Sequence, residues 1–64
     1  MEKVFDTKYG EVTVRNAMFD TDGTNLDEGI ELKGDEIGLM EVYGYRDIED
    51  MTEEEVEIII FKKL

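Results

Sequence analysis

The chain of 64 residues contains no cysteine, histidine, proline or tryptophan. Without cysteine it can form neither a disulfide nor a thiolate–metal centre. The absence of histidine removes the usual zinc ligand, the commonest general base near neutral pH and the Ser–His and Cys–His pairs of nucleophilic catalysis. A domain of this size buries only about 60% of its unfolded surface, so without a covalent or metal staple we expect oligomerisation to add stability.

Long apolar runs are missing as well. No stretch approaches the roughly 20 apolar residues that span a bilayer. The N-terminal sequence MEKVFDTKYGEV lacks the apolar segment of a signal peptide. No repeat or low-complexity linker divides the chain. We therefore expect a single domain over residues 1–64 that is soluble and cytoplasmic and has no membrane partner.

Positive charge is scarce and unevenly placed. The formal net charge is −11. In residues 1–19 acidic and basic side chains are equal in number. Residues 20–57 carry fifteen acidic side chains against two basic ones, and two lysines follow at residues 62 and 63. Such a field keeps a protein soluble, repels nucleic acid and favours basic surfaces or cations as partners. An acidic surface with no specific role explains the same charge.

The first two thirds of the sequence predict four short strands. Residues 4–7 are rich in strand formers, and residues 11–19 alternate between apolar and polar side chains. The same period returns at residues 30–33 and 37–43, with glycine-containing turns between the runs. Regular turns without an intervening helix favour an antiparallel meander.

The last segment predicts a helix over residues 53–63. Thr52 is a candidate N-cap, and Glu55 stands at the spacing of a capping box. Met51 and Val56 occupy the positions of a hydrophobic staple. The run IIIF is rich in strand formers, but the cap residues define both a beginning and an end. The fold class is therefore α+β, a four-stranded antiparallel meander followed by one C-terminal helix (ββββα).

Ile58 and Phe61 lie on a stripe of this helix beside the one formed by Val56 and Ile60. They would either widen the buried face or form an oligomer interface, since a large exposed apolar patch is normally functional. The small core favours the interface, and hence a homodimer or a higher homo-oligomer.

Residues 20–31, DTDGTNLDEGIE, resemble a calcium loop. The fifth position holds Thr24 and the sixth, which requires glycine, holds Asn25, so a helix–loop–helix calcium site is not expected. The simplest interpretation is a long loop between two strands that carries carboxylates.

Four carboxylates of this segment are nevertheless oxygen ligands of the kind that Mg²⁺ accepts: Asp20, Asp22, Asp27 and Glu28. Magnesium-assisted phosphodiester hydrolysis is the hydrolytic chemistry that these residue types permit, and no catalytic residue is assigned. Ordinary surface acids are the alternative.

A few residues have the chemistry of nucleic-acid or partner contacts. Tyr45 and Arg46 bring a ring and a guanidinium together after the fourth strand, and such side chains stack on bases and dominate interfaces. Packing at a strand end is the alternative. DNA contact would also use the cations of the balanced N-terminal part, Lys3, Lys8 and Arg15.

The segments DGTNLDEGIEL and MEVYGYRDIEDM, in a small ββββα chain, resemble a family of short anti-CRISPR proteins from gut clostridia and their mobile elements. The resemblance covers nearly the whole chain. It implies a reduced coactivator-like ββββα fold, oligomeric assembly and antagonism of type II-A Cas9 in the cytoplasm of a bacterial host cell. It also implies nicking of supercoiled plasmid DNA, which would make the DNA a poorer target because negative supercoiling helps to open the R-loop.

Two functions follow as hypotheses. In the first, the protein acts on DNA as a magnesium-dependent nickase and relaxes a supercoiled plasmid. In the second, it is an acidic DNA mimic that binds the basic groove of Cas9 or another nucleic-acid enzyme without catalysis.

Overall fold

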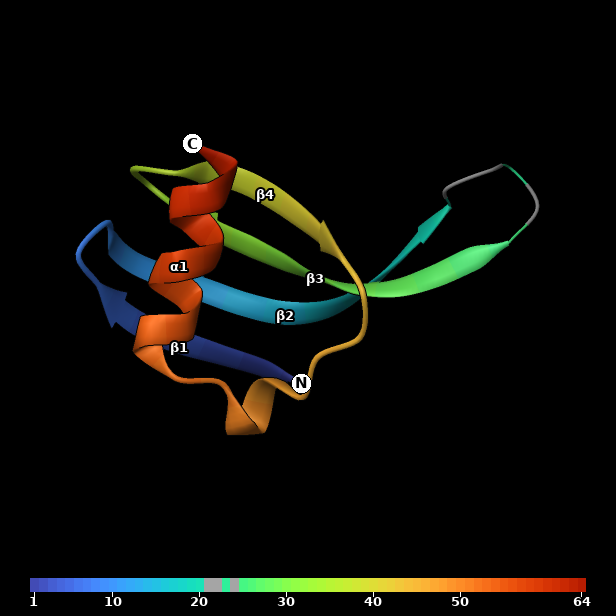
Figure 1. Cartoon of the computed structure of the whole chain (residues 1–64), viewed down its shortest axis with the longest axis horizontal. Coiled ribbons are helices and arrows are strands. Elements are labelled where there is room, and N and C mark those ends of the chain that lie inside the picture. The colour runs from blue at the N-terminus through green and yellow to red at the C-terminus, as the bar shows by residue number, and fades with distance from the viewer. Residues whose placement is uncertain (21–22, 24) are drawn as a thin grey trace.

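The computed structural model describes residues 1–20, 23 and 25–64 (Figure 1). Over these residues the chain forms one antiparallel sheet in the order β1-β2-β3-β4, followed by a short 3₁₀ helix and an α-helix. The elements are β1 (Glu2–Thr7), β2 (Gly10–Asp20), β3 (Leu26–Gly34), β4 (Gly38–Tyr43), η1 (Ile48–Asp50) and α1 (Glu53–Lys63). The predicted ββββα fold is confirmed.

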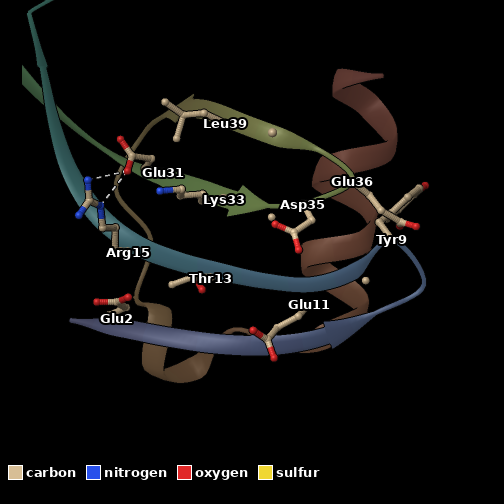
Figure 2. A pocket seen from close by; sticks show the side chains of 13 residues that line it. Glu2, Tyr9, Glu11, Thr13, Arg15, Glu31, Lys33, Asp35, Glu36 and Leu39 are labelled. Atoms are coloured by element: carbon tan, nitrogen blue, oxygen red, sulfur yellow. Dashed lines mark hydrogen bonds and ion pairs between the residues drawn. The ribbon is translucent and has the colours of Figure 1, made fainter.

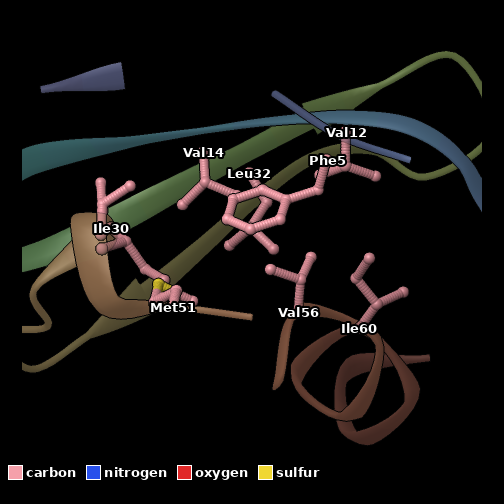
Figure 3. Packing of buried hydrophobic residues seen from close by; sticks show 9 residues of the cluster. Phe5, Val12, Val14, Ile30, Leu32, Met51, Val56 and Ile60 are labelled. Atoms are coloured by element: carbon pink, nitrogen blue, oxygen red, sulfur yellow. The ribbon is translucent and has the colours of Figure 1, made fainter. Parts of the chain in front are cut away.

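One face of the sheet, the inner face, is covered by η1 and α1. The strand register sets Phe5 opposite Val12, and Val14 opposite Leu32, so these apolar side chains point to the same side. Figure 3 shows them meeting the helical segment. The buried core comprises Phe5, Val12, Val14, Ile30, Leu32, Ile48, Met51, Val56 and Ile60. It is the period-2 alternation of β2 and β3 that supplies most of its sheet side.

Helix α1 begins and ends where its capping residues predict. The side chain of Thr52 accepts a hydrogen bond from the Glu55 backbone N–H at 3.2 Å. Met51 and Val56 are both buried in the core, as a hydrophobic staple requires. Ile58 and Phe61 are 48% and 69% exposed, so they do not extend the buried face of the helix.

Two parts of the chain differ from the sequence-based expectation. Strand β3 begins at Leu26 rather than at residue 30, so Asp27 and Glu28 lie in a strand and not in a loop. These residue types are poor strand formers, but Met18 and Phe19 of β2 pair with them. In Figure 1, β2 and β3 extend past the rest of the sheet as a two-stranded arm.

The 3₁₀ helix η1 was not expected either. The side chain of Asp47 caps it by accepting a hydrogen bond from the Glu49 backbone N–H at 3.2 Å. Ile48 then enters the core almost completely. This turn redirects the chain from the end of β4 across the inner face to the start of α1.

Candidate interaction surface on the open face of the sheet

The opposite face of the sheet, the outer face, has no helix over it (Figure 2). Its side chains form rows across the strands because the register aligns them. One row runs Glu2, Arg15, Glu31, Glu41 from β1 to β4. Arg15 is bound to Glu31, with Nε and Nη2 lying 2.8 and 2.7 Å from the Glu31 Oε1 atom. The one cation of the row is therefore neutralised within the protein, and one carboxylate remains on each side of the pair, Glu2 and Glu41.

The outer face is hollowed at this row. Figure 2 shows side chains of all four strands and of the neighbouring turns around the hollow, which has a volume of about 980 Å³. Its acidic lining residues are Glu2, Glu11, Glu31, Asp35 and Glu36, and its basic ones are Arg15 and Lys33. The volume is that of a small-molecule site. Small-molecule sites, however, are mostly apolar and enclosed, whereas this hollow is open and charged.

An aromatic pair closes the end of the outer face beside the arm. The rings of Phe19 and Tyr43 meet edge to face with centroids 5.1 Å apart. Phe19 is 8% exposed although it lies on the outer face, because Tyr43 and the backbone at Gly29 enclose it. Tyr43 itself is 61% exposed and is not part of the core.

The structure does not gather the predicted magnesium ligands into one described cluster. Asp20 ends β2, and its Oδ1 atom accepts a hydrogen bond from the Gly23 backbone N–H at 2.6 Å. Asp27 and Glu28 are consecutive in β3, so their side chains point to opposite faces. Asp22 lies outside the described residues. Within residues 1–20, 23 and 25–64, no three carboxylates are grouped so that they could hold a metal ion. Magnesium binding stays a prediction.

The predicted nucleic-acid contacts are spread over the molecule rather than brought together. Lys3 lies on the inner side of β1, where its Nζ atom is 3.4 Å from the backbone oxygens of both Glu49 and Met51. Arg15 lies on the outer face, and Lys8 occupies the turn between β1 and β2.

Tyr45 and Arg46 follow β4 on an exposed segment. There Arg46 Nη1 donates to the Gly44 backbone oxygen at 3.4 Å. The five residues therefore share no common stripe, and their role in binding stays a prediction.

The acidic row is the feature that sequence reasoning missed. Glu2, Glu31 and Glu41 each stand at an outward position of the period-2 pattern of their strand, which was visible in the sequence. The alignment of Glu2, Glu31 and Glu41 across the strands depends on the register, which a single sequence does not give.

In the described part of the chain, no helix is long and apolar enough to cross a membrane. Comparisons with known proteins matched this chain to no family model, no curated protein and no solved structure. The resemblance to the anti-CRISPR family therefore stays a prediction.

Proposed function

We propose that the protein is a non-catalytic acidic antagonist whose outer sheet face binds a basic groove of a nucleic-acid enzyme such as Cas9. The observation that supports this proposal is the open hollow of the outer face, which is lined by five carboxylates and two cations, Arg15 and Lys33, of which Arg15 is already paired with Glu31. A basic ridge along the wall of such a groove would enter the hollow and meet negative charge there without displacing any part of this chain.

Electrostatics favour such a partner over nucleic acid. The net charge of −11 repels phosphates and steers basic surfaces towards the molecule. Cas9-type enzymes hold the guide–target duplex in a positively charged channel and recognise it largely through its backbone. The carboxylates of the outer face have the same sign of charge as that backbone, so the protein would compete with the duplex for the channel.

The test is binding of the purified protein to Cas9 at low and high salt. We expect a complex that weakens as salt rises, because charges between partners are screened. In the variant Glu2→Gln/Glu11→Gln, which neutralises two carboxylates of the hollow, we expect affinity to fall about tenfold, which is roughly 1.4 kcal/mol.

The control variant is Asp50→Asn/Glu54→Gln, which makes the same change in net charge on the helical side of the molecule. Asp50 and Glu54 are exposed and lie outside the hollow. We expect this variant to bind Cas9 nearly as well as the unchanged protein. Equal losses in both variants would show that only total charge matters, and the absence of any complex with Cas9 or another basic nucleic-acid enzyme would end the proposal.

The DNA-directed hypothesis remains as a second proposal and rests on the family resemblance. Its assay is incubation of the protein with supercoiled plasmid and Mg²⁺, with and without EDTA. Relaxed plasmid in the magnesium reaction alone would place the activity on DNA and not on the enzyme. An unchanged plasmid together with a salt-sensitive complex would assign the function to the outer face.

A further inference from the structure

The two free edges of the sheet differ in charge. The edge strand β1 carries Glu2, Lys3 and Asp6, and α1 packs against it. The edge strand β4 has the sequence GLMEVY, with Glu41 as its one charged residue. Natural proteins protect open sheet edges with charge, proline, bulges or covering elements. β4 has neither proline nor lysine, so its edge is the less protected of the two.

The backbone of β4 presents hydrogen-bonding groups to this open edge. The Gly44 N–H donates to the Glu28 backbone oxygen at 2.9 Å, which sets the even-numbered residues of the strand towards β3. In an antiparallel ladder the residues between them point the other way. The amides and carbonyls of Leu39, Glu41 and Tyr43 therefore face outwards.

The side chains of β4 are incompletely covered on both faces. Leu39 and Tyr43 are 59% and 61% exposed on the outer face. Met40 and Val42 are only half-buried on the inner face, whereas Val14 and Leu32 of the neighbouring strands are fully buried. A strand that added to this edge would bury apolar surface on both sides of the sheet as well as pair the free backbone groups.

We propose that β4 is a dimerisation edge, on which β4 of a second copy pairs antiparallel with Met40 opposite Met40, so that the two sheets become continuous. In this register Leu39 lies opposite Glu41 of the second copy. Both residues have outward amides and carbonyls, so each such pair exchanges two hydrogen bonds. A register centred on Glu41 would set two carboxylates opposite each other, which is destabilising.

Charge complementarity selects the Met40-centred register. Lys33 pairs with Leu39 inside the chain, so it would lie two strands away from Glu41 of the second copy. Adjacent strands are about 4.8 Å apart, and extended lysine and glutamate side chains span the resulting separation of roughly 10 Å. Lys33 is exposed, and among the described residues it has no ion-pair partner.

Glu41, for its part, lies opposite Glu31, whose carboxylate Arg15 already binds. A cation supplied by the second copy would relieve this contact between like charges. In a register centred on Val42, Glu41 would lie opposite Tyr43 of the second copy, with Gly29 of that copy one strand further away. Neither residue carries positive charge.

A second copy also explains why pairing would stop at two. The two-fold axis forms the Lys33–Glu41 contact twice. The sheet edges that remain open are the two charged β1 strands, which disfavour further pairing, so the assembly ends at a dimer. The six-residue edge is about 20 Å long. Such an interface lies at the low end of specific interface sizes, so we expect a weak dimer. Because each copy carries −11, its association should strengthen as salt rises, opposite to binding of a basic partner.

The direct test is amide hydrogen exchange followed by NMR over a range of protein concentrations. The Phe61→Glu variant is used so that contacts through the helix cannot contribute. We expect the Leu39 and Glu41 amides to become at least tenfold more protected as concentration rises. The matched internal control is Val4, whose amide faces the other open edge, since the Asn16 N–H donates to the Met1 backbone oxygen across β1 and β2.

Charge exchange tests the register. We expect Lys33→Glu and Glu41→Lys each to weaken the dimer about fivefold, and the double variant to recover most of the loss. The two single changes move the net charge in opposite directions, so general repulsion cannot explain a loss in both. Leu39 and Glu41 amides that exchange at the same rate at every concentration would overturn the dimer edge. A double variant as weak as the single ones would overturn the proposed register.

Discussion

Gly29 is the position where the structure makes the sharpest energetic prediction. A Cβ atom there would lie 2.4 Å from the Val42 backbone oxygen and 2.6 Å from Cε2 of Phe19. Both distances are below what real Cβ atoms show, and the Val42 oxygen belongs to the backbone that pairs β4 with β3. Gly29→Ala must therefore move a strand as well as a ring.

The expected loss follows from these two contacts. Overpacking typically costs about 1–3 kcal/mol, and a weakened backbone hydrogen bond adds about 0.5–1.5 kcal/mol. We expect Gly29→Ala to lower the free energy of unfolding by about 2–4 kcal/mol. A chain of 64 residues has roughly 3–10 kcal/mol of stability in total, so the variant should be strongly destabilised.

Urea unfolding followed by circular dichroism measures this loss as a shift of the midpoint at constant slope. Gly38→Ala is the matched control, since it also adds one methyl group but has no atom within 4 Å of the new Cβ. Its φ of +70° makes alanine strained there, at about 1–2 kcal/mol. A Gly29→Ala variant within 0.5 kcal/mol of the unchanged protein would refute the steric argument.

Three further outcomes are expected. Thr52→Ala should lower stability by about 1 kcal/mol in the same urea assay, because the hydrogen bond to the Glu55 amide is lost. Phe61→Glu should give a smaller species than the unchanged protein in sedimentation, because it places a charge in the exposed apolar patch of α1; an unchanged protein that is monomeric at micromolar concentration would contradict this. If Asp20 and Asp22 hold an ion, millimolar Mg²⁺ should raise the melting temperature, and the double change to Asn should abolish that rise. If they are ordinary surface carboxylates, neither Mg²⁺ nor the double change should lower the melting temperature.

The fold was predictable where local chemistry and long-range packing agree. Alternation in β2 and the cap and staple around Thr52 each identify their element from a few residues, and tertiary packing supports both. The beginning of β3 was not predictable, because Asp27, Glu28 and Gly29 disfavour strands on their own. Their partners across the sheet, above all Phe19, hold these residues in the strand.

The candidate site was less predictable than the fold. Composition indicated an acidic binding surface. The residue patterns, however, predicted separate candidate sites in the segment at residues 20–28 and at several cations that are far apart in the sequence. Lys3 and Arg15 lie in different strands, so the register between β1 and β2 decides whether their side chains point to the same face of the sheet. This register puts them on opposite faces. The neutralisation of Arg15 by Glu31 likewise arises between residues of separate strands.

The order of elements also has a mechanical consequence. β1 is an edge strand, and the helix that contacts it is α1, the last element of the described chain. The Lys8 N–H, beside β1, donates to the Glu57 carboxylate at 2.8 Å. A force that acts on α1 therefore peels this helix from the sheet first. A force that acts on β1 separates this strand from β2 one hydrogen bond at a time. A sheet pulled in this direction does not have its ladder sheared as a whole, so an unfolding motor that pulls on β1 or on α1 should unfold these elements with little force.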